Sequence, residues 1–539
     1  MKLRADLVQM YRDVHSWVGI IAGLFLFVAF YAGAITMFEE PLKQWASPPV
    51  MLPPPVSLEQ TPELLQKTFT AHPEAQNDYT IAVTPEDAKR GRLTWEPEQG
   101  LGPTRNRHSS GQTFSAGLDQ QGNLVVVPKI TSETARFVDV LHQTVGLPLP
   151  HNIASFVMGT VALLYAVALV SGVIAYLPAL VKMLFAVRLG QSLRKRWLDF
   201  HNLLGLFSLP FHIIMAVSSV VFAFHGQIFA LEHKLFPTTV AATQQAAQGG
   251  NGLHRHGGRH QGGQPEIQPS AAGAEQLPQA LLRPMLAPSA VVATVAQQAP
   301  GFVPEVLNYM RLGKGRDVIR VFGHDDRYPT RGPTGGFMVL NGYTGQAQTT
   351  DYLPGHQQTK FAILTTFFSL HFGSFGGTPV RWLYVVLGLA GAFLFYTGNQ
   401  LWVVTRRRKE KERGHVQETR GTWVLSALTT GCTLGCVAGI SALFCAVPFL
   451  PGGGQQQAVS ALYYTVFCAF VVAAFCLPGQ RGIRLLLAVA GGITALVPVM
   501  LCINATPFLH NAQGVSLTVT ASLLSLFLLV WAARYKRQL

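Results

Sequence analysis

Charged side chains are scarce in this sequence. Asp, Glu, Lys and Arg together make up 13% of its 539 residues, while 49% are hydrophobic. Soluble domains carry about 25% charged residues, so the composition excludes an ordinary soluble protein. The apolar residues also gather into runs of about twenty, the length with which a helix crosses a hydrocarbon core of about 30 Å. Eight such runs predict eight transmembrane helices: 16–38, 153–177, 202–225, 382–404, 423–448, 459–477, 485–503 and 514–532.

Cysteine is absent from the two long segments that separate the first four runs. All six cysteines lie in or beside the last four runs, at Cys432, Cys436, Cys445, Cys468, Cys476 and Cys502. The long segments therefore have no disulfide framework to stabilise them. Cys432 and Cys436 are one helical turn apart, and we expect them to pack as small buried side chains.

Basic residues outnumber acidic ones, and the formal net charge is +14. Such an excess is also found in nucleic-acid-binding proteins, but here Lys and Arg gather at alternate ends of the runs, as the positive-inside rule requires. Segments 1–14, 178–200, 405–422, 478–484 and 533–539 carry 3, 5, 7, 2 and 3 of them, and the loops 449–458 and 504–513 carry none. We therefore expect both termini in the cytoplasm, a lipid bilayer around the runs, and no nucleic-acid partner.

The two long segments then face outward, and each predicts a small α+β module. The first has a helical stretch at 62–67 and a hairpin-like stretch at 117–127; the second has a helical stretch near 290–297, a strand-like stretch at 317–322 and a final stretch at 336–345. Residues 239–285 are rich in Ala, Gln, Gly and His and predict a disordered linker. The fold class is thus a membrane all-α bundle of about eight transmembrane helices with two outer α+β modules.

The order of run, module and run occurs twice, in 1–180 and in 195–408, and is followed by a separate helical block. The predicted divisions are 1–38 (N-terminus and first helix), 39–150 (first module), 151–225 (second and third helices with a basic cytoplasmic loop), 226–378 (second module with its linker), 379–408 (fourth helix) and 423–532 (C-terminal block of four helices).

Histidines recur at matching places in the two repeats. His15 lies at the cytoplasmic start of the first run and His201 at the start of the third. His142 lies outside, just before the second run, and His371 just before the fourth. The repeat therefore predicts one histidine pair at each face of the membrane, His15 with His201 and His142 with His371.

Imidazole is a standard axial ligand of haem iron, and two imidazoles from different helices can hold one porphyrin between them. Three of these histidines are followed four residues later by glycine, which lies on the same helix face and leaves room for a flat ring. The alternative is that the glycines serve close helix packing and the histidines form interfacial hydrogen bonds. His212, about three helical turns after His201, is a further candidate ligand, either of the outer haem or of another one. His151 and His225 are expected to have ordinary interfacial roles.

The motifs around these histidines resemble the PepSY-associated transmembrane helix family, which includes bacterial inner-membrane ferrisiderophore reductases. The resemblance covers 9–40, 140–180, 196–228 and 364–408 and rests on Val14-His15-Ser16-Trp17-Val18-Gly19, on Phe200-His201 through Leu209-Pro210-Phe211-His212, on Leu370-His371-Phe372-Gly373 with Arg381-Trp382-Leu383-Tyr384, and on Asn341-Gly342-Tyr343-Thr344-Gly345-Gln346, which is similar to the closing hairpin of a PepSY module. It implies periplasmic PepSY modules, b-type haem and the reduction of iron chelates in the periplasm. The last four runs depart from the family's four-span pattern.

The resulting hypothesis is transmembrane electron transfer through two haems b, held by His15, His201, His142, His371 and His212, with a ferric siderophore as the acceptor. This would make the chain a ferric-chelate reductase, an oxidoreductase of the bacterial inner membrane. The sequence has no Gly-x-Gly-x-x-Gly fingerprint for a nucleotide domain, and its cytoplasmic segments total fewer than 80 residues. Quinol or a separate reductase must therefore supply the electrons.

Two other functions fit parts of the sequence. One is a haem-free membrane scaffold whose PepSY modules bind a periplasmic partner or protease. The other is transport of the chelate itself, which is disfavoured because charged residues are absent from deep inside the predicted spans, where substrate pathways usually have them.

Reporter fusions test the predicted topology. Fusions at Gly100 and Gly262 should report an outer location, and fusions at Gly190 and Gly414 a cytoplasmic one, because the basic segments lie on the cytoplasmic side. An alkaline phosphatase reporter is active only outside and a fluorescent protein only inside. A cytoplasmic signal at Gly100 would invert the topology.

Overall fold

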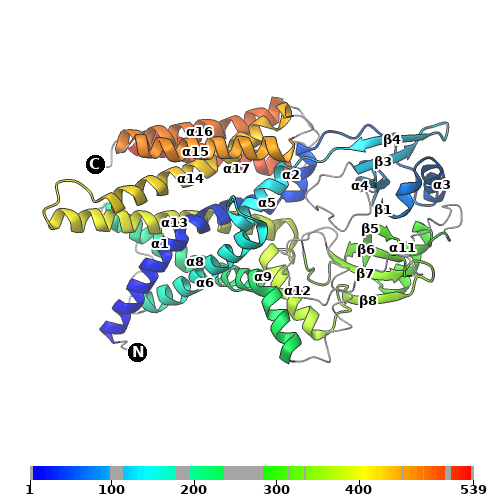
Figure 1. Ribbon diagram of the computed structural model, residues 1–539, viewed down its shortest axis with the longest axis horizontal. Coiled ribbons are helices and arrows are strands. Elements are labelled where there is room, and N and C mark those ends of the chain that lie inside the picture. Colours follow the sequence, from blue (N-terminus) through cyan, green and yellow to red (C-terminus); the bar gives the residue numbers. More distant parts are fainter. Residues whose placement is uncertain are drawn as a thin grey trace, which may run out of the picture.

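The computed structural model describes residues 4–97, 113–177, 193–235, 283–312, 316–332, 335–450, 454–477, 479–503 and 512–535. A bundle of long helices occupies one end of the molecule and an antiparallel sheet the other (Figure 1). Both chain ends lie at the end of the bundle that is remote from the sheet (Figure 1). The expected linker at 239–285, with His254, His256 and His260, lies almost entirely outside the described residues.

Seven described helices are long and apolar enough to cross a membrane. They are α1 (Ala5–Thr36), α6 (His151–Tyr176), α13 (Gly377–Glu412), α14 (Arg420–Ala446, which continues as a short 3-10 turn to Phe449), α15 (Gln456–Cys476), α16 (Gln480–Ile503) and α17 (Ala512–Arg534). Large apolar side chains remain exposed along them, for example Leu523 on α17, which is 62% exposed. Such faces are expected where a helix borders lipid. Seven of the eight predicted spans are thereby confirmed as long apolar helices.

The third predicted span, 202–225, is not one straight helix. The chain forms α8 (Leu193–Phe207) and α9 (Leu209–Leu235) instead, and the helix axis bends by 70° between their apolar parts. Pro210 explains the break, because proline has no backbone N–H to donate and its ring collides with the carbonyl four residues earlier. If this bent pair counts as one span, the described spans number eight.

Each of the two predicted α+β segments supplies helices and strands, and the strands of both segments form one sheet. The eight strands lie in the order β4-β3-β2-β1-β5-β6-β7-β8, and every pairing is antiparallel. The first segment supplies β1 (Asp78–Ala82), β2 (Leu93–Trp95), β3 (Thr113–Leu118) and β4 (Leu124–Lys129); the second supplies β5 (Val303–Met310), β6 (Val318–His324), β7 (Gly336–Asn341) and β8 (Ala347–Tyr352). The predicted hairpin at 117–127 is the β3–β4 pair.

The seam between the two segments is the pairing of β1 with β5. Tyr79 lies opposite Tyr309, with the two rings stacked at 4.6 Å, and Ile81 lies opposite Leu307. Ile81, Tyr309 and Leu307 belong to a single buried cluster that draws residues from both segments. Helices α3 (Thr61–Ala71) and α11 (Pro288–Gln298) contribute Leu64, Val291 and Val295 to that cluster. The two segments therefore share one hydrophobic core.

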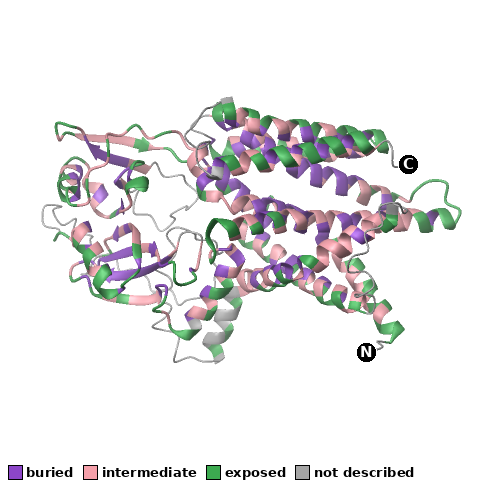
Figure 2. Ribbon diagram, turned by 180° about the vertical axis from the view of Figure 1, so that it is seen from behind, coloured by how far each residue is buried: buried purple, intermediate pink, exposed green. Residues whose placement is uncertain are grey.

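Three shorter helices lie at the end of the bundle that faces the sheet (Figure 1): α2 (Glu39–Ala46), α5 (Thr134–Thr144) and α12 (Thr359–Phe372). Helix α5 packs against α1 and α6, and α12 packs against α9 and β8. In the C-terminal block, α14 lies innermost: two thirds of its apolar stretch is buried (67%), against 22% for α15 and α17. Figure 2 shows exposed residues on the outward faces of the block and buried residues along the strands of the sheet.

Candidate functional site: two histidine pairs

The structure brings together both histidine pairs that the repeat predicts. His15 on α1 and His201 on α8 have their ring centres 6.0 Å apart, with the ring planes at 67°. His142 on α5 and His371 on α12 have their ring centres 6.2 Å apart, with the planes at 41°. We call these the first pair and the second pair. In each, the partners come from opposite halves of the repeat.

Each ring is fixed through its Nδ1 atom. His15 Nδ1 lies 2.8 Å from Ala168 O on α6, His142 Nδ1 lies 2.8 Å from Ala29 O on α1, and His201 Nδ1 lies 3.2 Å from Leu394 O on α13. A carbonyl oxygen only accepts, so Nδ1 carries the proton in all three rings. In a neutral ring, Nε2 then keeps its lone pair free to bind a metal.

His371 also carries its proton on Nδ1, and here the acceptor is a serine hydroxyl. Its Nδ1 lies 2.7 Å from Ser218 Oγ on α9. The single hydroxyl proton of Ser218 is given to Ile214 O at 2.6 Å, so the hydroxyl oxygen accepts from His371 Nδ1. Burial first, and the neighbouring His142 second, lowers the pKa of His371 to about 3. The ring is therefore neutral at physiological pH, which is the form that binds metals.

Three of these rings lie against a glycine of the neighbouring helix, where a larger residue would leave no room. A Cβ atom on Gly172 would lie 2.8 Å from His15 Nδ1, one on Gly33 would lie 2.6 Å from His142 Nδ1, and one on Gly398 would lie 3.3 Å from His201 Cε1. Each of these glycines follows the accepting carbonyl by four residues. A residue four positions on lies on the same helix face, so a side chain there would block the ring.

The spacing within each pair suits a shared metal. A histidine nitrogen binds a metal at about 2 Å and lies about 1.1 Å from the centre of its own ring, whose bonds are about 1.3 Å long. Two imidazoles on opposite sides of one metal ion therefore have ring centres about 6.2 Å apart. The observed 6.0 and 6.2 Å agree with this value. No group of three or more His, Cys, Asp or Glu that could hold a metal ion stands among the described residues, and each candidate donor set is a pair of histidines.

The two pairs lie at different depths of the bundle. Helix α1 carries His15 and, fourteen residues later, the carbonyl of Ala29 that binds His142, which is about 21 Å of helix. The first pair is held by the carbonyls of Ala168 on α6 and Leu394 on α13. Both helices start at the sheet side, and each carbonyl lies seventeen residues after that start, which is about 25 Å of helix. The first pair is thus nearer the chain termini, and the second pair borders the sheet.

His212 lies between the two pairs but has different surroundings. Its ring is fully buried, and Nδ1 lies 2.5 Å from the hydroxyl oxygen of Tyr165. Its Nε2 atom is buried and has no hydrogen-bond partner among the described residues. The rings of Phe30, Tyr165, Phe211 and Phe395 stand around it with centres at 5.5 to 6.0 Å. The expectation that His212 binds haem remains a prediction, and the arguments below rest on the four paired histidines.

The acceptors and their glycines are the site residues that sequence reasoning missed. Gly33, Gly172 and Gly398 stand inside apolar runs, where a glycine costs helix stability, and that is the signal that could have marked them. The glycines that we did single out behave differently. A Cβ on Gly19 would meet nothing within 4 Å, one on Gly205 would make one ordinary contact at 3.7 Å, and Gly146 lies beyond the end of α5. Of the three, only Gly19 and Gly205 leave open space beside their backbone.

The interfacial roles expected of His151 and His225 stay predictions. Ser155 Oγ lies 3.3 Å from His151 Nε2 at the start of α6. The side chain of His225 is not among those described. Cys436 is fully buried and Cys432 partly buried, and all six cysteines are free. Cys432 and Cys436 therefore pack as small buried side chains, as expected.

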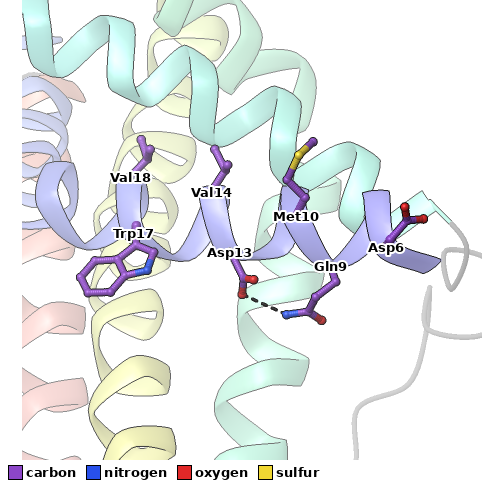
Figure 3. A pocket seen from close by; sticks show the side chains of 7 residues that line it. All are labelled: Asp6, Gln9, Met10, Asp13, Val14, Trp17 and Val18. Atoms are coloured by element: carbon purple, nitrogen blue, oxygen red, sulfur yellow. Dashed lines mark hydrogen bonds between the residues drawn. The ribbon is translucent and has the colours of Figure 1, made fainter. Parts of the chain in front are cut away.

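A hollow of about 680 Å³ on α1 lies near the chain start. All its lining residues belong to this one helix (Figure 3): Asp6, Gln9, Met10, Asp13, Val14, Trp17 and Val18. Gln9 donates a hydrogen bond to Asp13 at 3.0 Å. Since no second element lines it, the hollow is an open surface of the helix and adds nothing to the site.

Comparison with known proteins identifies a family for most of the chain. The PepSY-associated TM region matches residues 12–404. The chain belongs to this family. The match includes all four paired histidines, their acceptors and the whole sheet, and it stops before the four helices α14 to α17. No curated protein matches the chain. The resemblance drawn from the histidine motifs is thereby confirmed for the PepSY-associated TM family.

The role of the glycines leads to a stability prediction. Gly172→Ala should lower the free energy of unfolding by about 1–3 kcal/mol, because a Cβ at that position overpacks against His15. Gly492→Ala on α16 is the matched control, since a Cβ there would meet nothing within 4 Å. It should be neutral or stabilising by up to about 1 kcal/mol. Thermal unfolding in detergent measures both, and equal destabilisation by the two changes would contradict the assignment.

Proposed function

We propose that the protein carries electrons across the inner membrane of a bacterium and reduces ferric iron held by a chelator on the sheet side. Each histidine pair would hold one haem b. The observation that carries the proposal is the presence of two pairs, at two depths, with ring centres at the separation expected of two imidazoles on one metal. Both chain termini would face the cytoplasm and the sheet the periplasm.

The protein's own groups prepare the four rings for ligation. Backbone carbonyls at Ala29, Ala168 and Leu394 and the hydroxyl of Ser218 hold the proton on Nδ1. Such partners fix the tautomer and the orientation of a metal-binding histidine. When bound, haem supplies reversible one-electron exchange at its iron. Because the ligands come from α1, α5, α8 and α12, the packing of these helices sets the geometry of both sites.

Aromatic side chains fill the space between the two depths. Phe30 adjoins Ala29, the acceptor of the second pair, and Phe395 adjoins Leu394, an acceptor of the first. Their rings are 5.0 Å apart, and both contact Tyr165. Close packing of this kind excludes water between the pairs. Since electron tunnelling falls steeply with distance, two redox sites at separate depths suit the thickness of a bilayer.

The sheet adjoins the second pair and is where we place the acceptor. Ser374, three residues after His371, donates to Thr330 O in the loop between β6 and β7 at 2.9 Å. The guanidinium carbon of Arg331 in the same loop lies 4.6 Å from the ring centre of Phe368 on α12. Ferric iron binds hard oxygen chelators far better than ferrous iron, so one added electron releases the metal and leaves the chelator intact. A ferric siderophore is the acceptor that we propose.

The electron donor must be outside this chain. The chain has no nucleotide-binding fingerprint, so quinol in the membrane or a separate reductase would supply electrons to the first pair. The last helices, α14 to α17, contribute no histidine to either pair.

Histidine substitutions test haem ligation. His15→Ala or His201→Ala should remove one haem and leave the other visible in the reduced absorption spectrum, because each pair would hold its haem independently. His142→Ala or His371→Ala should remove the other. The haem-to-protein ratio should fall by about half in every case. Purified wild-type protein without haem bands would favour the scaffold hypothesis, and ratios unaffected by all four changes would refute the pairing.

Iron reduction is tested in a single-turnover assay. Protein reduced anaerobically in detergent should be reoxidised when a ferric siderophore is added, and Fe(II) should appear in a ferrozine trap. His371→Ala should slow the reoxidation at least tenfold, because the second pair is the exit to the sheet side. Gly492→Ala serves as the control and should react like the wild type. Haem that is indifferent to every ferric chelate would remove the iron-reductase assignment and leave electron transfer to another acceptor.

A further inference from the structure

The C-terminal block, residues 420–535, contacts the helix that carries His142. The family match ends at residue 404, so nothing in the match explains these four helices. Their buried residues join those of α1, α2 and α5 in one cluster, which includes Leu141 of α5, Leu443 of α14 and Val459 of α15. The block is therefore part of the packing around α5, and α5 belongs to the matched region.

Both ends of α5 are bonded to the block. At its start, Glu133 N donates to Gly454 O at 3.1 Å. Just after its end, the hydroxyl of Tyr464 on α15 donates to Gly146 O at 2.7 Å. Between these bonds, the ring of Phe137 contacts the rings of Tyr463 and Tyr464, with centres at 5.3 and 6.1 Å. His142 lies within this clamped stretch, one helical turn before Gly146.

The turn after His142 has an unfavourable backbone conformation. Val145 has φ 48°, and it is the one residue other than glycine with positive φ in the part of the chain that the structure describes. A β-branched residue in this region is a genuine outlier, and such conformations persist where the surroundings hold them. The next residue, Gly146, also has positive φ and is the one whose carbonyl accepts from Tyr464. The block thus bonds to the strained turn itself.

The corresponding helix of the second repeat is hydrogen-bonded to described side chains of α9, α13 and the segment around it. Helix α12 ends at Gly373 with φ 61°, a conformation that glycine adopts without strain. Tyr384 on α13 donates to Leu370 O at 2.5 Å, and Ser374 bonds to the β6–β7 loop. His371 is therefore supported by family-matched elements, and His142 depends in addition on α15.

We propose that the C-terminal block is a clamp that positions α5 and, through it, His142, with Tyr464 as the positioning residue. The significance of the clamp for a haem site rests on the function proposed above. The clamp itself consists of contacts within this chain and is measurable without any bound group. It assigns a role to the part of the chain that lies beyond the family match.

The test compares Tyr464→Phe with Tyr463→Phe in the full chain. Both changes remove one hydroxyl and keep the ring against Phe137, but the hydroxyl of Tyr463 lies beside Cys436 within the block. Hydrogen–deuterium exchange of 134–146 reports the opening of α5. Tyr464→Phe should speed it about threefold to tenfold, as the loss of one hydrogen bond predicts. Exchange of 359–372 should not change, and neither should exchange of 134–146 in Tyr463→Phe.

A spectroscopic readout then links the clamp to the second pair. In Tyr464→Phe the midpoint potential or the electron paramagnetic resonance signal of one haem should shift while the other keeps its wild-type value. Unchanged exchange of 134–146 would overturn the clamp, whatever the haem content. Faster exchange with both haem signals unaltered would overturn its link to His142. Wild-type protein without haem would instead refute the proposed function, and the exchange result would still decide whether α5 is clamped.

Discussion

The arrangement of the bundle depends on hydrogen bonds from imidazole rings to groups on neighbouring helices. A carbonyl inside a helix already accepts from the amide four residues on, and it can accept a second bond only where no side chain covers it. Gly33 and Gly172 provide that opening for His142 and His15. Each such bond fixes the distance and rotation between two helices, and it also leaves one ring nitrogen free. The packing of the bundle and the chemistry of the site therefore depend on the same contacts.

The second pair is the point at which three parts of the molecule meet. His371 on α12 is tied to the sheet through Ser374 and Thr330, and His142 on α5 is tied to the C-terminal block through Gly146 and Tyr464. Helix α1 joins both depths, because it carries His15 and also accepts from His142. A movement of the sheet or of the block would therefore change the geometry of the second pair before it changed that of the first.

The single sheet has a consequence for the repeat. Two small modules, each with a few strands, would have weak separate cores, since small domains bury only about 60% of the surface that their unfolded chains expose. Pairing β1 with β5 joins them, and Ile81, Leu307 and Tyr309 fill one core. The two halves of the repeat are thus joined at the sheet as well as at the histidine pairs. The repeat produces one site-bearing unit rather than two.

The sequence by itself determined the long apolar helices, some of the strands, the family and the pairing of the histidines, because each follows from a local pattern or from the repeat. Runs of apolar residues specify helices that lie in lipid, and equivalent positions in two repeats come together when the repeats pack side by side. The sequence did not reveal the glycines that admit the rings, the bend at Pro210, the common sheet or the clamp on α5. Apart from the bend, for which Pro210 is a local cause, these features depend on which surfaces meet across gaps of a hundred residues or more, as Tyr464 and Gly146 do. Only the packing of the whole chain decides that, because a glycine or a tyrosine hydroxyl carries no local sign of its partner.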